Sequence, residues 1–223
     1  MKKEIIVALP AKGRIKIPSL NIFKKNKLKI FSEKGERDLI GYVKSKNFNL
    51  KILFVHAREA IDALANSTAD VAISGKDLLF NSNTKIQKKI KIYKDLDFGI
   101  ASVKIFRSIY WIDCQSLLDV SEIARSKPLK LITKYRLLVE NFLAEKNVRN
   151  VEVIDSNGAT EIAVRINQAS LVADVSETGS TASANDLFEL NDGLILKTSA
   201  ALMVSKKSNK RKEVRDLIKL LSN

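Results

Sequence analysis

Short apolar runs alternate with helix-like stretches along most of this chain. The apolar runs have the length of buried strands and lie at residues 4–9, 51–55, 71–74, 130–133, 151–154 and 171–175. The stretches that we expect to be helical lie at residues 18–24, 58–66, 116–124, 135–146 and 210–221. Strand, helix and strand joined by short links form a βαβ unit, so the pattern predicts an α/β protein with parallel sheet.

Two such sets of strands and helices are separated by a looser middle section. Residues 92–105 are typical of extended chain, and the apolar stretch 194–204 could cross back from one set to the other. Because no Gly/Ser-rich linker interrupts the chain, we expect two short β crossovers in place of a flexible tether. The predicted boundaries are lobe I at residues 1–91 and 186–223, and lobe II at residues 92–185.

The most distinctive local sequence is the stretch 171–187, an apolar run that breaks into a hydroxyl-rich loop. The loop, residues 177–181, reads Glu-Thr-Gly-Ser-Thr and leads into helix-compatible residues. Gly179 lets backbone N–H groups approach a ligand closely, and the start of a helix carries a partial positive charge. These features predict a phosphate cradle. An ordinary loop with a Ser or Thr helix cap explains the same residues and, for this stretch alone, is the commoner arrangement.

A second candidate anion site follows the first predicted strand. Arg14 could hold phosphate oxygens with both prongs of its guanidinium, while Gly13 beside it allows close approach. A surface turn at Lys12-Gly13-Arg14 is an equally good explanation. Arg37, in the loop that begins at Gly35, has the same two explanations with less support.

The other reactive side chains favour structural roles. His56 is the only histidine, and no Ser/His/Asp set can be assembled around it. Cys114 is the only cysteine, so the chain has neither an internal disulfide nor a cysteine metal cluster, and its neighbour Trp111 indicates packing. One cysteine fits a reducing, cytoplasmic compartment. The first apolar stretch, residues 5–9, is too short for a signal peptide.

The charge balance predicts a polyanionic partner. The formal net charge is +14, from 39 Lys and Arg against 25 Asp and Glu. Nucleic acid and phosphorylated small molecules both fit such a charge. The 29 lysines (39 less 10 arginines) are scattered, and no basic module with interleaved aromatic residues appears, so a solvated lysine surface is favoured over a nucleic-acid interface. No window approaches the ~20 apolar residues of a membrane span, so we expect no membrane association.

Several segments together resemble the ATP phosphoribosyltransferases, the first enzymes of histidine biosynthesis, in their short form. The resemblance covers nearly the whole chain in family order, in ALPAKGR at 8–14, GERDL at 35–39, DVAISGKDLL at 70–79, LDFGIA at 96–101, ITKY at 132–135, VEVIDSNGATEIA at 151–163, LVADVSETGSTASANDL at 171–187 and DGLILKTSAAL at 192–202. One departure is Asn185-Asp186-Leu187, where the family usually has Asn-Gly-Leu.

The resemblance implies a fold like the type II periplasmic binding proteins. Two α/β lobes would be joined by two crossovers, with the active site in the cleft between them. The chain ends soon after residue 221, so we expect the histidine-binding domain of long-form enzymes to be absent. Short-form enzymes work with a separate regulatory subunit similar to histidyl-tRNA synthetase. We therefore expect a homodimer that assembles with this subunit into a hetero-oligomer.

The resemblance also implies the chemistry and the residues that carry it. N1 of ATP would attack C1′ of 5-phosphoribosyl 1-pyrophosphate, with Mg²⁺ bound through the substrate phosphates and not by a protein metal site. Arg14 and Arg37 would be catalytic. The implied substrate-binding residues are Lys12, Gly13, Lys76, Lys134, Glu161, Asp174, Glu177, Thr178, Gly179, Ser180 and Thr181.

Two other functions would explain the same sequence features. One is a non-catalytic module of the same fold that binds a small anion. The other is a basic nucleic-acid-binding protein, whose affinity would depend steeply on salt. Turnover of ATP and phosphoribosyl pyrophosphate separates the enzyme from both.

Overall fold

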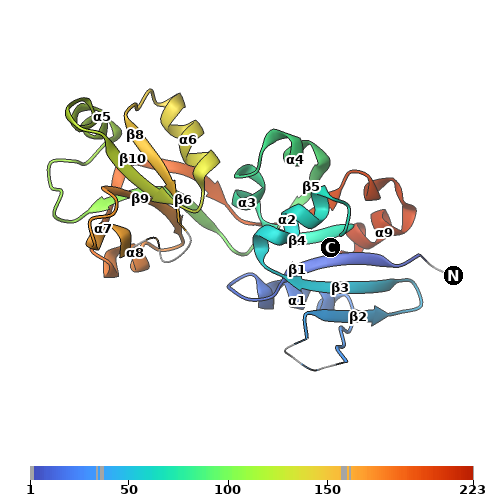
Figure 1. Ribbon diagram of the computed structural model, residues 1–223. Coiled ribbons are helices and arrows are strands. Elements are labelled where there is room, and N and C mark those ends of the chain that lie inside the picture. Colours follow the sequence, from blue (N-terminus) through green and yellow to red (C-terminus); the bar gives the residue numbers. More distant parts are fainter. Residues whose placement is uncertain (1–2, 34, 36–37, 157–159, 161, 223) are drawn as a thin grey trace. The chain divides into compact units, whose positions relative to one another are not determined.

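The computed structural model describes most of the chain, at residues 3–33, 35, 38–156, 160 and 162–222. Two compact units are present, unit 1 with residues 1–99 and 199–223 and unit 2 with residues 100–198 (Figure 1). The sequence placed the two crossings near residues 92 and 186. Each lies later in the structure, because the strand after residue 90 pairs within unit 1 and the strand after residue 187 pairs within unit 2.

Unit 1 is built on a mixed sheet with strand order β2-β3-β1-β4-β11-β5. Its strands are β1 (Ile5–Pro10), β2 (Ile40–Lys44), β3 (Asn49–Val55), β4 (Val71–Gly75), β5 (Ile90–Asp95) and β11 (Ala200–Ser205). Its α-helices are α1 (Lys16–Lys25), α2 (Ala57–Ala65), α3 (Lys76–Phe80), α4 (Thr84–Lys89) and α9 (Lys212–Leu221). Both neighbours of β1 run parallel to it, as the βαβ pattern predicts, whereas β2, β11 and β5 each pair antiparallel.

Two apolar clusters cover the two faces of this sheet. Val7 of β1 packs in a cluster that includes Phe23 of α1 and Leu217 of α9. The next residue, Ala8, belongs to a cluster with Ile61 of α2. Successive side chains of a strand point to opposite faces, so α1 and α9 cover one face and α2 the other. Burial on both faces explains why the central strands are apolar throughout.

Unit 2 carries a second mixed sheet, with strand order β10-β6-β9-β7-β8. Its strands are β6 (Ala101–Ser108), β7 (Leu129–Thr133), β8 (Val151–Asp155), β9 (Leu171–Ser176) and β10 (Leu187–Thr198). Its helices are α5 (Leu117–Ser126), α6 (Arg136–Glu145), α7 (Ile162–Arg165) and α8 (Ser180–Ala184). β7 runs parallel to β8 and β9, while β6 is antiparallel to β9 and β10. The loops after β7, β8 and β9 therefore leave from one edge of the sheet.

Side chains at the helix starts explain several polar residues. His56 is the N-cap of α2, and its backbone N–H donates to the Glu59 carboxylate at 2.8 Å. At α5 the hydroxyl of Ser116 accepts from the Asp119 N–H, and the Asp119 carboxylate accepts from the Ser116 N–H at 2.8 Å. These reciprocal bonds satisfy N–H groups that a helix leaves unpaired at its start. At the start of α2 the bond to Glu59 uses the backbone of His56.

Three elements differ from the sequence-based expectation. β2 was not predicted, and α3 begins at Lys76, where a closing loop was expected. β10 starts at Leu187 and passes through a register shift between Glu189 and Leu194. Within residues 3–33, 35, 38–156, 160 and 162–222, no helix has the length and apolar character needed to cross a membrane.

Candidate functional site

In unit 2 the predicted site residues gather at the carboxyl ends of the parallel strands. Thr133, the last residue of β7, is in register with Asp155 of β8 and with Ala173 of β9. Lys134 follows β7 directly and is exposed, and Asp174 follows Ala173 within β9. The structure therefore brings Lys134 and Asp174 to one edge of the sheet. Lys104 of β6 is in register with Asp174 on its other side.

The loop 177–181 has the backbone that the glycine predicts. Gly179 is left-handed, with φ +81°, and it is the N-cap of the short helix α8. Its N–H donates to the Ser176 hydroxyl at 2.9 Å, and the Thr178 and Ser180 hydroxyls lie 2.9 Å apart. A Cβ at Gly179 would meet nothing within 4 Å, so the space beside this backbone is open.

Exposed groups surround that open space. Glu177, Thr178, Ser180 and Thr181 are all exposed, while Ala182 is buried and anchors α8 against the sheet. The Asp174 carboxylate is half-buried and accepts the Val175 N–H at 2.7 Å. Hydroxyl donors on a left-handed glycine turn suit an anion such as phosphate. The carboxylates of this edge suit the hydroxyls of a sugar.

Unit 1 places its predicted residues on an equivalent edge. Lys12, Gly13 and Arg14 are exposed in the loop between β1 and α1, and Gly13 has φ +86° with no atom within 4 Å of a Cβ there. Lys76 starts α3 directly after β4, which runs parallel to β1. Its ammonium group is bound to the Asp95 carboxylate at 2.5 Å, and the Lys76 side chain is only 17% exposed. A ligand would meet Lys76 as one half of an ion pair.

Two predicted residues lie outside the described part of the chain. They are Arg37, predicted as catalytic, and Glu161, predicted to bind substrate. Their assignments stay predictions from sequence.

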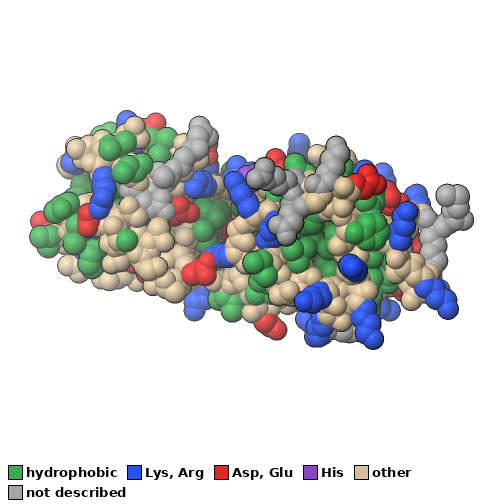
Figure 2. All heavy atoms as spheres, turned by 90° about the horizontal axis from the view of Figure 1, so that it is seen from below, with side chains coloured by type: hydrophobic (Ala, Val, Ile, Leu, Met, Phe, Trp, Pro, Cys, Tyr) green, Lys and Arg blue, Asp and Glu red, His purple; other side chains and the backbone are tan. Residues whose placement is uncertain are grey.

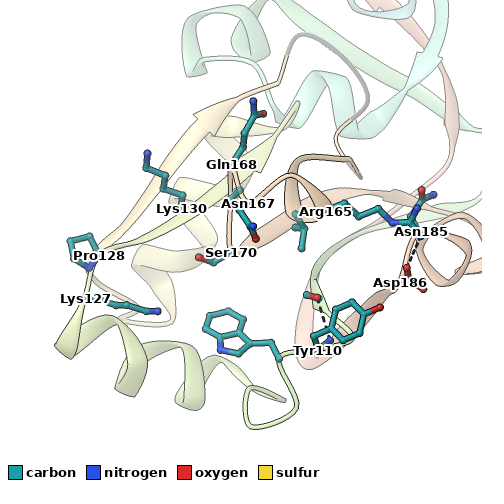
Figure 3. Close-up of a pocket in the computed structure, with 14 residues that line it drawn as sticks. Tyr110, Lys127, Pro128, Lys130, Arg165, Asn167, Gln168, Ser170, Asn185 and Asp186 are labelled. Carbon is teal, nitrogen blue, oxygen red and sulfur yellow. Dashed lines mark hydrogen bonds and ion pairs between the residues drawn. The ribbon is translucent and has the colours of Figure 1, made fainter.

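A polar pocket of about 620 Å³ lies at the opposite edge of the unit 2 sheet (Figure 3). Its lining includes Lys127, just before β7 begins, and Ser170, just before β9 begins. Figure 3 shows Tyr110 at its rim and the ion pair of Arg165 with Asp186, whose Nη2 and Oδ2 atoms are 2.5 Å apart. The pocket contains none of the predicted site residues, and no sequence pattern pointed to it.

The surroundings of Cys114 do not activate its thiol. Burial, followed by the nearby Asp119 carboxylate, raises the pKa of the Cys114 thiol to about 11, so the thiol stays protonated at neutral pH. Among the residues that the structure describes, no group of three His, Cys, Asp or Glu side chains could hold a metal ion. Lys and Arg side chains are scattered over the face drawn in Figure 2.

Sequence reasoning passed over one residue at the unit 2 edge. The Thr133 side chain is fully buried, its hydroxyl donates to the Ala173 carbonyl at 2.7 Å, and it accepts from the Tyr135 N–H at 2.9 Å. Threonine is common in β-strands, so its place at the end of β7 indicates no functional role by itself. The contact with Ala173 spans 40 residues, and no local pattern signals it.

Comparison with known proteins gives one consistent family. A family model described as HisG, ATP phosphoribosyltransferase, matches residues 56–223. The ATP phosphoribosyltransferase of Rhizobium etli is 31% identical over 212 residues, which are 92% of this chain and 91% of that protein. The relative from Nitrobacter winogradskyi is 29% identical over 215 residues, 94% of this chain but 66% of that protein. The chain thus spans about two thirds of some relatives and nearly all of others.

Solved structures confirm the expected fold class. A chain of the ATP phosphoribosyl transferase (HisG:HisZ) complex from Thermotoga maritima matches with a TM-score of 0.77 at 18% identity, covering 97% of this chain and 96% of that one. Holo ArgBP from T. maritima matches with a TM-score of 0.55 at 14% identity, covering 98% and 87%. A substrate-binding domain of a putative amino acid ABC transporter from Streptococcus pneumoniae gives 0.53 at 14% identity, covering 98% and 90%. At these identities the likeness concerns the fold alone, which is the type II periplasmic-binding-protein arrangement of two α/β lobes.

Proposed function

The chain belongs to the ATP phosphoribosyltransferase family, and on that premise we propose that it catalyses the first step of histidine biosynthesis. ATP condenses with 5-phosphoribosyl 1-pyrophosphate to give N1-(5-phosphoribosyl)-ATP and pyrophosphate. One observation carries the proposal. The family model matches residues 56–223, and this span includes the turn around Gly179, whose left-handed backbone borders open space.

The reaction exchanges one bond at C1′ for another. The lone pair on N1 of adenine forms the N1–C1′ bond, and the C1′–O bond breaks with its electrons leaving on pyrophosphate. The protein has to align N1 with C1′ and to stabilise the charge that grows on the leaving group. Neither task requires a nucleophilic side chain, which agrees with the protonated state of the buried Cys114.

We assign the 5′-phosphate of phosphoribosyl pyrophosphate to the loop 177–181. Thr178, Ser180 and Thr181 supply hydroxyl donors, and Gly179 permits close approach. Asp174 or Glu177 accepts hydrogen bonds from the ribose hydroxyls. Lys134 contributes from the loop after β7, and Glu161 is assigned a substrate contact from its sequence alone.

We assign stabilisation of the leaving pyrophosphate to Arg14 and Arg37. A guanidinium aimed at an oxygen that gains charge binds the transition state better than the ground state. Lys12 and Gly13 flank Arg14 and bring backbone and charge to the same anion. Lys76 contributes as the ion pair with Asp95, which holds the ammonium group in place.

Mg²⁺ is proposed to arrive on the substrate phosphates. The described residues do not fit a protein-held ion, because no cluster of three suitable ligands occurs among them. Oxygen-rich phosphates are the usual partners of Mg²⁺ in such sites. We classify the enzyme as a pentosyltransferase of the glycosyltransferase class.

We further propose that the protein is the catalytic subunit of a short-form enzyme. The T. maritima match is named as a HisG:HisZ complex, and this chain covers 96% of the chain matched there. By analogy, a homodimer of this chain would assemble with a regulatory subunit similar to histidyl-tRNA synthetase. We place the assembly in the cytoplasm, where the lone unpaired Cys114 would remain reduced.

Pyrophosphate release tests the proposal directly. The purified chain is given ATP, phosphoribosyl pyrophosphate and Mg²⁺, with and without the regulatory subunit, and pyrophosphate is measured together with the phosphoribosyl-ATP product. Release that requires both substrates supports the enzyme. Saturable binding of phosphoribosyl pyrophosphate with no turnover in either condition would instead indicate the non-catalytic anion-binding module.

A further inference from the structure

One buried hydroxyl links two of the loops to which the proposed function assigns substrate contacts. Thr133 ends β7, and its side chain is fully buried. The hydroxyl donates to the carbonyl of Ala173, whose neighbour is Asp174, and it accepts from the N–H of Tyr135, whose neighbour is Lys134. One hydroxyl has one donor and two acceptor positions, so both contacts can exist at once.

The backbone of Thr133 also contacts the loop that follows β8. Its carbonyl accepts the N–H of Ser156 at 2.8 Å, just after β8 ends at Asp155. Parallel pairing of Thr133 with Asp155 and with Ala173 places the residue between both neighbouring strands. The backbone contacts need no particular side chain. The two hydroxyl contacts require an oxygen at this position.

We propose that Thr133 is a positioning residue for the phosphoribosyl transfer. Its hydroxyl fixes the Lys134 turn relative to Asp174 and so fixes where phosphoribosyl pyrophosphate is held. The inference rests on the proposed function for its chemistry and on the two hydroxyl hydrogen bonds for its geometry. Thr133 is fully buried, so it acts through Lys134 and Asp174.

Substitution by valine or by serine separates the oxygen of Thr133 from its shape. Valine has nearly the shape of threonine but no oxygen. Thr133→Val therefore removes both hydroxyl hydrogen bonds and still fills the space of the threonine side chain. The Tyr135 N–H and the Ala173 carbonyl each lose the hydroxyl, and the turn that carries Lys134 can shift. A displacement of about 1 Å at a reacting pair can cost on the order of a hundredfold in rate. Thr133→Ser keeps the oxygen and should keep both bonds.

The test compares Thr133→Val, Thr133→Ser and the control Leu129→Val. Leu129 is buried at the opposite end of the same strand, so its substitution disturbs the core without touching the loop edge. We expect Thr133→Val to lower kcat/KM for phosphoribosyl pyrophosphate by on the order of tenfold or more, with a smaller change in the KM for ATP. Thr133→Ser and Leu129→Val should stay near the native values, with all variants shown to be folded by their circular dichroism.

Hydrogen exchange supplies a readout that does not depend on turnover. Without substrates, Thr133→Val should speed exchange of the Tyr135 amide and of amides 174–181, and Thr133→Ser should not. Native exchange and native kinetics in Thr133→Val would overturn the inference, as would an equal kinetic loss in Leu129→Val or in Thr133→Ser. If the native chain shows no turnover, the proposed function fails, and the exchange result alone decides whether Thr133 ties the loops together.

Discussion

At the scale of single residues, the glycine of the loop 177–181 gives the sharpest expectation. Gly179 is left-handed, and a Cβ there would meet open space and not protein. Gly179→Val should therefore disturb the backbone, at a cost of about 1–2 kcal/mol, and should also project into the proposed phosphate site. We expect weaker binding of phosphoribosyl pyrophosphate in a calorimetric titration.

Asparagine separates the two causes, because it tolerates left-handed backbone. Gly179→Asn should keep most of the stability and still lose affinity, since its side chain occupies the same space. Native affinity in both variants would remove this loop from the phosphate site.

The two arginines assigned to pyrophosphate give the second residue-scale prediction. Arg14→Ala and Arg37→Ala should each lower kcat by on the order of a hundredfold and raise KM much less, because the lost interaction strengthens in the transition state. The measurement is kcat at saturating substrates with the regulatory subunit present, accompanied by a single-turnover experiment in case product release masks chemistry. Arg149, exposed in unit 2, is the matched control. Variants indistinguishable from Arg149→Ala would make both residues ordinary surface arginines.

At the scale of elements, an ion pair offsets the backbone cost of Asp186, which stands where the family usually has glycine. Asp186 has φ +55°, which explains why glycine suits this position, and its carboxylate pairs with Arg165 at 2.5 Å. Asp186→Gly should relax the backbone and lose an exposed ion pair of about 0.2–1 kcal/mol, so the two effects nearly cancel. Asp186→Ala should be less stable than Asp186→Gly by about 1 kcal/mol.

Urea unfolding of both variants measures this difference. The double variants with Arg165→Ala isolate the ion pair. An alanine variant as stable as the glycine variant would show that the left-handed backbone carries no cost here.

The start of α5 gives a prediction about pH. The Gln115 N–H, then the hydroxyl and N–H of Ser116, hold the pKa of Asp119 below its ordinary value of 3.8. A carboxyl whose folded pKa is lowered stabilises the fold above its unfolded pKa and loses that effect as pH falls through the folded pKa. The gap in Tm between the native chain and Asp119→Asn should be full at pH 6 and should narrow below about pH 4.

Glu122→Gln, an exposed site on the same helix, controls for the lost charge. A gap that stayed constant down to pH 2 would contradict this account of the cap.

The elements also show how far sequence could lead. Strands buried on both faces, such as β1, β4 and β9, were predicted because continuous apolar runs leave few alternatives. β2 was missed because Ile40–Lys44 is short, contains Gly41 and lies at the sheet edge. The first part of β10, residues 187–193, was missed because Asn191-Asp192-Gly193 has the composition of a turn, whereas the chain bulges there and Asp192 accepts the Leu117 N–H at 2.8 Å.

The site was predictable to a different degree. A short stretch of sequence was enough to predict the loops after β-strands, a glycine with positive φ and the hydroxyl-bearing residues. The resemblance supplied their roles. The ion pair of Lys76 with Asp95 and the hydroxyl tie of Thr133 to Ala173 could not, because each joins residues whose proximity depends on sheet order. Sequence periodicity fixes which face a residue occupies but not which strand lies beside it.

At the scale of the whole molecule, the short-form assignment predicts where feedback inhibition resides. Histidine should leave turnover by the isolated chain unchanged and should inhibit the complex with the regulatory subunit, because the resemblance gives the effector site to that subunit. Titrating histidine into both preparations, with a non-cognate amino acid as control, measures this. Strong, histidine-specific inhibition of the chain alone would contradict it.

The order of strands in unit 1 has a consequence for how the chain acquires its structure during synthesis. β11 lies between β4 and β5, yet its residues follow all of unit 2 along the chain. When the first 99 residues have been synthesised, the sheet of unit 1 therefore lacks the strand between β4 and β5. β5 has no neighbouring strand to pair with until residues 200–205 are made. Unit 2 is continuous and can close its own sheet first. In a ribosome-bound chain, unit 2 should therefore be folded before the sheet of unit 1 receives its last internal strand.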